Sequence, residues 1–539
     1  MSASAPQFPT NAQLFTEAQK LSAGKATTTD IARNIQTSYD ASPLPPSIKP
    51  RGDITTLLDL TSRDIQDDYL FPLTSETTWF TRDTERRVMP FTPLVQELPF
   101  RGPAAFGQRF SFDIGSLTVG DLLFGTALQI RLDHWLDAQT QLLLAAGRIR
   151  YAEPGAGWEY ANSLGSAIIA QAELEIDGDT VEIIDGDFIN TFGTVLPDFN
   201  TQFGVAADHQ GKRPLQRLVA AQTQQPRLWP TEAGILHCVL PFFFGRQRLA
   251  QEALPMIAIR EGLVRIHITL RPFDECVRQV RGWRDSCDAT PLAQPVTFVA
   301  GAGEAGVTLP RTVLASAVPP PFKSVQLVTY GAILDGPYRQ KMLREPFETM
   351  HRVVQTFSFD EPLKYAVGKR AEADTIRIQL PLEANHPVEE IVWFVRRKGV
   401  RDNNAWTNYT SVLEQEWLDA NGTAQAAARP LLLHAALQLN GITVCDADEQ
   451  YYRQLIAKAH RGGFAAYGSY IYGYPFARNP GEHQPSGTAN ASKLNTLRLT
   501  LDVRPPGGVL DAAWEVKVFC VGLNWMRYEH GLANPMFAD

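Results

Sequence analysis

Residues Leu174–Val181 read Leu-Glu-Ile-Asp-Gly-Asp-Thr-Val, and residues Leu437–Val444 read Leu-Gln-Leu-Asn-Gly-Ile-Thr-Val. Each stretch joins a strand-forming run to an Asp-Gly or Asn-Gly dipeptide and then to the start of a second run. These dipeptides favour a type I′ turn, because both central residues of that turn need positive φ. The sequence therefore predicts two β-hairpins of the same design, 263 positions apart (437 minus 174).

A second pair of strand patterns repeats in the same order. Residues 264–272 read Val-Arg-Ile-His-Ile-Thr-Leu-Arg-Pro, and residues 497–505 read Leu-Arg-Leu-Thr-Leu-Asp-Val-Arg-Pro, 233 positions later (497 minus 264). In both, apolar and polar residues alternate with the period of a strand, and a proline ends the run. Chance is the alternative, because such patterns recur in all-β proteins. The two matches together indicate one β-rich unit used twice.

Length and composition agree with a duplicated unit. The 539 residues suit two domains of roughly 200 to 250 residues each plus extensions. With 44% hydrophobic and 20% charged residues the chain resembles an ordinary globular protein, and 39 glycines with 37 prolines indicate many turns. The net charge of −8 argues against a broad basic surface, so we expect no direct nucleic-acid partner.

The five cysteines, an odd and small number, are typical of a protein made in a reducing compartment. They are Cys238, Cys276, Cys287, Cys445 and Cys520. We expect Cys445 and Cys520 to be buried apolar residues of strands, and pairing of Cys276 with Cys287 stays open. No run approaches 18 apolar residues and no secretory signal is visible, so we expect a soluble protein made in the cytosol.

Composition and strand patterns divide the chain into four parts. We expect an N-terminal arm (1–50), a first domain with long insertions (51–338), a connection (339–349) and a second domain (350–539). The arm is rich in Ala, Ser and Thr and closes on a proline cluster; it is either a disordered tail or a segment that orders against a neighbouring subunit.

Strand patterns dominate from residue 107 onward, for example in 109–114, 375–380 and 514–519, whereas helical patterns are short. One helix is expected over Asp448–His460, with Asp448 as its N-cap. Many antiparallel strands with few helices favour sandwiches or barrels over βαβ units. The predicted fold class is all-β: two consecutive eight-stranded antiparallel jelly-roll barrels with short inserted helices and long loops.

Sequence motifs typical of cofactor binding, metal binding or catalysis are either absent or stand in the wrong structural context. Gly301–Gly306 matches GxGxxG after a strand-like run, but Pro310 would break the helix that should follow, and no acidic residue stands about 20 positions on. Histidines occur singly, without HxH, HExxH or CxxC spacing, so no metal site is expected; His386 and His483 are interpreted as hydrogen-bonding structural residues. There is no GxSxG elbow, and Asp67 and Asp68 are too close in sequence for an acid and base pair. We expect no catalytic residues and no cofactor.

Two kinds of short motif, an RGD tripeptide and glycosylation sequons, are expected to have no functional role. Arg51–Asp53 forms an RGD tripeptide at a domain edge, which chance explains. Asn408, Asn421 and Asn490 begin formal glycosylation sequons, which we expect to stay unmodified in a chain without a secretory signal.

The most specific stretch is Tyr470–Ser492, an aromatic strand that leads into a loop of Pro, Gly and Asn residues: Tyr-Ile-Tyr-Gly-Tyr-Pro-Phe-Ala-Arg-Asn-Pro-Gly-Glu-His-Gln-Pro-Ser-Gly-Thr-Ala-Asn-Ala-Ser. Proline fixes φ and Asn and Ser bond their own backbone, so such a loop has a defined shape. This stretch closely resembles the signature of the major capsid proteins of nucleocytoplasmic large DNA viruses.

The resemblance is collinear and extends over nearly all of the chain after residue 50. It includes segments 66–70, 78–80, 120–122, 164–167, 240–244, 253–258, 385–388, 391–393, 521–527 and 531–533. Three positions depart from the family pattern: Ser166 stands where His is common, Pro475 where Ser is usual, and 246–252 lacks Asn-Pro-Gly. These departures leave the subfamily and the virus open.

The resemblance implies a double jelly-roll subunit of an icosahedral capsid. Three copies would form a homotrimer with six barrels, a pseudo-hexagonal capsomer that packs against neighbouring capsomers, and the long insertions 200–231 and 274–321 would form outer towers or trimer clasps. The arm would reach toward minor capsid and penton proteins or the internal viral membrane, with assembly in the host cytoplasm. The alternative is a jelly-roll sugar-binding protein or enzyme, since the fold hosts both.

Overall fold

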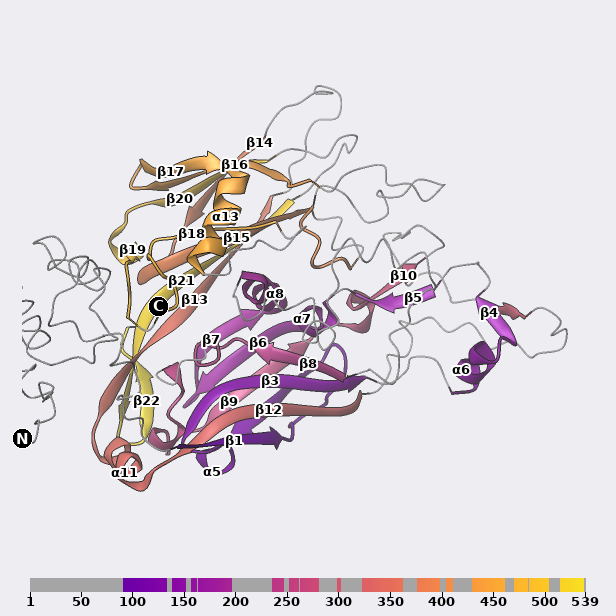
Figure 1. Ribbon diagram of the computed structural model, residues 1–539, viewed down its shortest axis with the longest axis horizontal. Coiled ribbons are helices and arrows are strands. Elements are labelled where there is room, and N and C mark those ends of the chain that lie inside the picture. Colours follow the sequence, from indigo (N-terminus) through magenta and orange to yellow (C-terminus); the bar gives the residue numbers. More distant parts are fainter. Residues whose placement is uncertain are drawn as a thin grey trace, which may run out of the picture. The chain divides into compact units, whose positions relative to one another are not determined.

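The computed structural model describes residues 91–132, 138–151, 157–161, 163–195, 235–246, 252–260, 262–280, 298–301, 322–361, 376–397, 404–410, 429–460, 470–482, 484–503 and 514–537. Their strands form two groups of antiparallel sheets that follow one another along the chain (Figure 1). We call the group up to residue 334 the first module and the group from residue 347 the second module. The expected arm and the tripeptide Arg51–Asp53 lie outside the described residues.

The first module contains two four-stranded sheets. One sheet has the order β1 (Phe91–Leu98), β12 (Phe322–Leu334), β3 (Leu122–Leu132) and β8 (Ile235–Leu240). The other has the order β2 (Arg109–Ile114), β9 (Val264–Leu270), β6 (Ile169–Ile176) and β7 (Asp179–Asp185). Counted along the chain, one sheet therefore holds the first, eighth, third and sixth of these strands and the other the second, seventh, fourth and fifth, which is the jelly-roll order.

The second module repeats this order. One sheet runs β13 (Phe347–Glu361), β21 (Trp514–Glu529), β15 (Pro387–Arg397) and β18 (Ile471–Pro475), with β19 (Ala489–Asn490) paired to β15 and β22 (Leu532–Pro535) paired to β21. The facing sheet runs β14 (Ile376–Leu382), β20 (Leu497–Val503), β16 (Leu432–Leu439) and β17 (Ile442–Asp448). The all-β double jelly-roll prediction is confirmed.

Short two-stranded ribbons and helices lie in the connections between the strands of the large sheets. Two small ribbons pair β5 (Gly157–Tyr160) with β10 (Val277–Val280) and β4 (Ile149–Tyr151) with β11 (Phe298–Ala300). The helices are α5 (Ser116–Val119), α6 (Ala138–Ala145), α7 (Leu164–Ala167), α8 (Gly186–Val195), α11 (Gly336–Arg344) and α13 (Glu449–Ala459), with 3₁₀ turns η6 (Met256–Ala258), η7 (Phe273–Glu275) and η9 (Ala491–Lys493). α11 connects β12 of the first module to β13 of the second.

The repeats seen in the sequence occupy equivalent places in the two modules. A shift of 263 positions carries β6 onto β16, β7 onto β17 and the first residue of α8 onto that of α13, and a shift of 233 carries β9 onto β20. Both hairpins have the expected positive φ, 58° and 94° at Asp177 and Gly178, and 49° and 80° at Asn440 and Gly441. The pairing irregularity after Leu174 recurs after Leu437. Such agreement in strands, turn and bulge confirms that one unit is used twice.

The two sheets of each module enclose its apolar side chains. β9 and β14 alternate buried and more exposed residues, as expected of strands with one covered face. β15 and β21 instead are buried almost throughout, on both faces. A second layer therefore covers the outer face of the β13–β21–β15–β18 sheet.

The helix expected over Asp448–His460 is present as α13, with Asp448 at its N-cap position but without a side-chain capping bond. Tyr452 and Ile456 of this helix are buried. Cys520 is fully buried as expected, whereas Cys445 is half-buried. Cys276 is a buried free thiol, and Cys287 lies outside the described residues.

Candidate functional site

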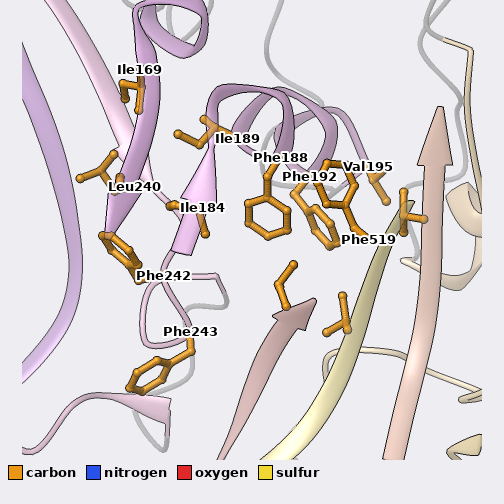
Figure 2. Close-up of a cluster of buried hydrophobic side chains, with 14 of the residues drawn as sticks. Ile169, Ile184, Phe188, Ile189, Phe192, Val195, Leu240, Phe242, Phe243 and Phe519 are labelled. Carbon is orange, nitrogen blue, oxygen red and sulfur yellow. The ribbon is translucent and has the colours of Figure 1, made fainter. Parts of the chain in front are cut away.

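The layer that covers the second module's sheet is helix α8 of the first module. In Figure 1, α8 lies between the strands of the first module and those of the second. Phe188 and Phe192 on α8 lie 4.4 Å apart by ring centroid and contact Phe519 of β21 at 5.4 and 6.3 Å (Figure 2). All three rings are buried, so apolar burial holds the two modules together.

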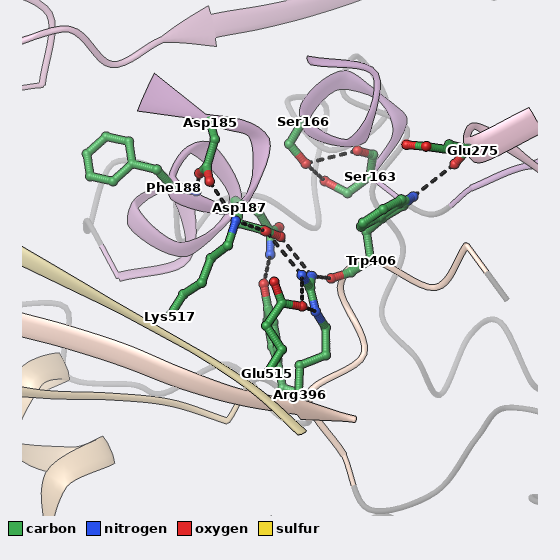
Figure 3. A network of polar contacts seen from close by, with 12 residues as sticks. Ser163, Ser166, Asp185, Asp187, Phe188, Glu275, Arg396, Trp406, Glu515 and Lys517 are labelled. Carbon is green, nitrogen blue, oxygen red and sulfur yellow. Dashed lines mark hydrogen bonds and ion pairs between the residues drawn. The ribbon is translucent and has the colours of Figure 1, made fainter. Parts of the chain in front are cut away.

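A buried ion network surrounds this aromatic contact (Figure 3). Arg396 of β15 forms a two-pronged pair with Asp187 of α8, Nη1 to Oδ1 at 2.8 Å and Nη2 to Oδ2 at 3.1 Å. The same guanidinium donates to Glu515 Oε2 at 2.8 Å and to the Trp406 carbonyl at 2.7 Å. Lys517 Nζ bonds Asp187 Oδ2 at 2.6 Å. Two cations thus share one carboxylate of the first module.

Charge pairing determines the ionisation of this network. Burial alone would raise the pKa of Asp187, but the charges of Arg396 and Lys517 outweigh burial and hold it well below its usual range. Burial likewise opposes the charge of Lys517, yet Asp187 and Asp185 raise its pKa. Asp187 and Lys517 are therefore charged at neutral pH, and removing one of them would leave a buried charge with less compensation.

A loop of the second module extends the same junction. Trp406 Nε1 donates to the Glu275 carbonyl at 2.9 Å, and the Arg271 guanidinium carbon lies 3.9 Å from the centre of the Trp406 ring. Asn190 of α8 donates to the Tyr409 hydroxyl at 2.8 Å. Residues 404–410 thereby tie α8 and the end of β9 to the second module.

A second buried network lies further along the junction. Arg352 of β13 donates from Nε to Glu389 Oε2 at 2.7 Å and also pairs with Glu252 of the first module. Arg246 of the first module pairs with Glu182 and donates from Nη1 to the Arg352 carbonyl at 2.9 Å. Both networks therefore place charges of the first module against strands of the second.

The signature loop folds onto this second network. The Gly481 amide donates to Glu389 Oε1 at 3.1 Å, and Arg352 Nη2 donates to the Glu482 carbonyl at 2.6 Å. Within the loop, the Asn479 amide donates to Ser486 Oγ at 2.9 Å, and Ser486 Oγ donates back to the Asn479 carbonyl at 3.1 Å. The Asn, Gly and Ser of the signature thus shape a loop that closes over a buried ion pair.

A third buried pair joins His460, which follows α13, to Glu390 of β15, with Nε2 and Oε2 2.6 Å apart. Burial opposes the protonated ring, but the Glu390 charge and hydrogen bond raise the pKa of His460 above its usual value. This pair fixes the C-terminal end of α13 on its own module.

The residues that the sequence analysis singled out are dispersed. Asn408 is buried, and its Oδ1 accepts hydrogen bonds from the amide and hydroxyl of Thr410; Asn490 is exposed. The backbone of His386 donates to Ser492 Oγ and accepts from Ala491, within the signature region. Asn421, His483 and the GxGxxG stretch after Gly301 lie outside the described residues.

The junction residues themselves were not predicted. Asp187 and Arg396 stand 209 positions apart, and neither belongs to a spaced motif. The one available signal was the acidic Asp185-Gly-Asp187 at the end of a strand together with Arg396-Arg397 at the end of another, but charge pairs of this kind occur throughout any sequence.

The contacts of the junction hold the two modules together and do not form a reaction site. The charged side chains of the junction are paired with each other, and within the described ranges no group of three or more His, Cys, Asp or Glu side chains is placed to bind a metal ion. No helix in the described part of the chain is long and apolar enough to span a membrane.

Two jelly rolls fastened by buried ions and aromatic rings define a structural, double jelly-roll protein. The family models agree: "Large eukaryotic DNA virus major capsid protein" matches residues 339–533, and "Major capsid protein N-terminus" matches residues 78–297. The chain belongs to the major capsid proteins of large eukaryotic DNA viruses. It is a component of the virion capsid, and its relatives are structural proteins rather than enzymes.

Individual relatives support this assignment. The chain is 24% identical to the major capsid protein of Phaeocystis pouchetii virus over 90% of the chain and 99% of that protein. It is 26% identical to that of Chrysochromulina ericina virus over 63% of the chain, a match that spans 57% of that relative.

Solved structures of low sequence identity share the fold. PBCV-1 VP54 superposes with a TM-score of 0.58 at 18% identity, over 85% of this chain and all of that one. The Faustovirus major capsid protein superposes with a TM-score of 0.56 at 11% identity, over 86% of this chain and 94% of that one.

Proposed function

We propose that three copies of this chain form a homotrimer that acts as a pseudo-hexagonal capsomer and tiles an icosahedral shell with its neighbours. The observation that carries the proposal is the internal duplication. Two modules with the same strand order in each chain give six similar modules in a trimer. A capsomer of near six-fold outline can fill a flat hexagonal lattice. Within the capsomer, a closed ring of identical chains needs only one kind of contact between neighbouring chains.

An exposed apolar surface on the first module supports assembly. β1 is an edge strand whose side chains are exposed at almost every position, including Phe91 and Val95. Tyr330 on the adjacent β12 is also exposed. Unprotected edge strands with apolar side chains are a liability in a monomer, and burial between subunits removes it.

The long connections supply a candidate outer surface. β5, from the connection between β3 and β6, pairs with β10, from the connection between β9 and β12, and β4 pairs with β11 in the same way. Both connections therefore rise from one end of the module (Figure 1). We propose that this end faces outward, because loops tolerate added length while barrels do not. The expected towers or clasps at 200–231 and most of 274–321 lie outside the described residues.

The remaining assignments are part of the same proposal. The arm 1–50 is proposed to reach beneath the capsomer toward minor capsid proteins, penton proteins or the internal membrane, and assembly is proposed to take place in the host cytoplasm. Residues 51–338 and 350–539 would be the two jelly-roll domains, with 339–349 as their connection.

Sedimentation equilibrium of the purified full chain tests the oligomeric state. The expected mass is about three times the 59.8 kDa of one chain, and it should not change when the protein is diluted into the nanomolar range, as expected of a large obligate interface. A monomer or dimer across that range would contradict the proposal. Negative-stain images of the trimer should show a six-lobed outline.

A further inference from the structure

The outer face of the same sheet is largely covered in the second module and partly exposed in the first, where Val95 and Tyr330 are exposed but Val328 beside them is not. In the second module, Val354, Val521 and Arg396 on the outer face of β13–β21–β15–β18 are each less than 10% exposed, and α8 contacts this face at Phe519 and Arg396. In the first module the corresponding sheet, β1–β12–β3–β8, exposes Val95 at 59% and Tyr330 at 37% of their surfaces.

A shared irregularity fixes which residues correspond. The pairing of β12 with β3 shifts between Tyr330 and Gly331, and the pairing of β21 with β15 shifts between Val521 and Gly522. Aligning these two shifts places Tyr330 on Val521 and Leu123 on Val388. The same alignment places Arg131 on Arg396 and, through the β1–β12 and β13–β21 registers, Val95 on Val354.

The helix that covers the sheet is duplicated too. α8 and α13 directly follow equivalent strands, β7 and β17, and the 263-position shift carries Phe188 onto Tyr451 and Phe192 onto Leu455. Phe188 is fully buried against the second module, whereas Tyr451 is 50% exposed.

The residues of each helix that face their own module correspond as well. Ile189 of α8 and Tyr452 of α13 occupy equivalent positions, and both are buried. α13 therefore packs on its own module as α8 does, and its second face is the one left uncovered.

We infer that α13 of one subunit docks on the outer face of the β1–β12–β3–β8 sheet of the next subunit, as α8 docks on the second module within one chain. The occupant is a second copy of this chain, because among the described helices α13 is the one that carries the duplicated counterpart of the α8 surface. By the same alignment the counterpart of Phe519, which Phe188 and Phe192 contact, is Val328, so Tyr451 and Leu455 would pack on Val328 and on Tyr330 and Val95 beside it. This inference rests on the proposed trimer and specifies its contact.

The charges of the α8 contact are duplicated only in part. Arg131, the counterpart of Arg396, is exposed, and Asp448, the counterpart of Asp185, is exposed at the start of α13. Within the chain, the acidic start of α8 faces Arg396 and Lys517. Between chains, Asp448 would lie near the sheet that carries Arg131, while the counterparts of Asp187 and Lys517 are the uncharged Gln450 and Gln326, so this contact would hold fewer ion pairs than the one within the chain. The contact is head-to-tail, so each subunit uses both surfaces, and six modules close the ring after three chains.

Sedimentation velocity of full-length variants tests the contact. Tyr451→Asp and Val95→Asp should each convert the trimer to monomer at micromolar concentration, because each places a charge in an apolar contact. Tyr338→Asp makes the same chemical change at a similarly exposed residue of α11, outside the contact, and should leave the trimer intact. A trimeric wild type whose Tyr451→Asp and Val95→Asp variants both stay trimeric would overturn the inference while leaving the proposed function in place.

Cross-linking provides a readout that does not depend on weakening the protein. A chain carrying Tyr451→Cys is mixed with one carrying Val95→Cys, the mixture is reassembled from dilute denaturant, and the disulfides are formed with copper phenanthroline. A covalent dimer should appear in the mixture and in neither variant alone. Its absence from a mixture that reassembles into trimers would overturn the inference, whereas a monomeric wild type would instead refute the proposed trimer.

Discussion

Arg396 and Asp187 belong to different modules, stand 209 positions apart, and meet in a two-pronged ion pair that is shielded from solvent. Lys517 and Glu515 complete the group, so the junction carries two cations against two carboxylates, with Asp185 beside them. Such a group fixes the orientation of the two modules as well as stabilising their contact, because a planar guanidinium fits a carboxylate in one orientation. The relative placement of the two modules within the chain is thus encoded in specific side chains.

Loss of the Asp187 carboxylate should strongly destabilise the chain. In Asp187→Ala, Arg396 and Lys517 stay buried with less compensation, and we expect a loss of about 3 to 5 kcal/mol in the free energy of unfolding, measured by urea denaturation. The control is Glu173→Ala, whose partner Arg109 is half exposed and which should cost less than about 1 kcal/mol. Equal losses in the two variants would refute the assigned role of the junction.

His460 should make stability depend on pH in a defined direction. Its pKa is raised in the folded chain, so its contribution is fully present below the unfolded pKa of about 6.5 and is lost as pH rises through the folded pKa. The difference in melting temperature between wild type and His460→Gln should therefore be largest near pH 5.5 and shrink toward pH 9. His530, which is 87% exposed beside Glu529, provides the control: a His530→Gln difference that changes equally with pH would argue against the buried pair.

Gly487 should resist substitution. Its φ is 149°, and a Cβ there would lie 2.8 Å from the Phe476 carbonyl oxygen. Gly487→Ala should lower stability by about 1 to 3 kcal/mol and loosen the signature loop over the Arg352–Glu389 pair, seen as faster amide exchange at Gly481. Gly336→Ala, where a Cβ would meet nothing within 4 Å, should be neutral or slightly stabilising.

The two duplicated turns should respond alike to the same change. Gly178 and Gly441 have φ of 94° and 80°, and neither has an atom within 4 Å of an added Cβ. Gly178→Ala and Gly441→Ala should each cost about 1 to 2 kcal/mol through backbone conformation alone, measured by urea denaturation. A cost at one turn and none at the other would show that the hairpins, though equivalent in position, differ in strain.

The fold was largely predictable because its signals are local. The turn dipeptides at 177–178 and 440–441 and the alternation in 264–270 and 497–503 depend on neighbouring residues only, and these elements lie where the patterns predict. The burial of β15 on both faces, by contrast, depends on α8, a helix from another part of the chain.

The junction was not predictable for the opposite reason. A pair such as Arg396 and Asp187 is defined by the meeting of two modules, and no spacing rule connects residues 209 positions apart. The signature residues Asn479, Gly481 and Ser486 identified the family. Their structural role, which is to close a loop over Arg352 and Glu389, is seen only in the folded chain.

The unequal ends of each module have a practical consequence for engineering. Peptide tags or epitopes belong in the connections between β3 and β6 or between β15 and β16, outside the β4–β11 and β5–β10 ladders and outside residues 404–410, which contact the first module. At the other end, the two-residue turns at Gly178 and Gly441 set the register of their hairpins, and a single inserted residue would turn every following side chain of the strand to the wrong face.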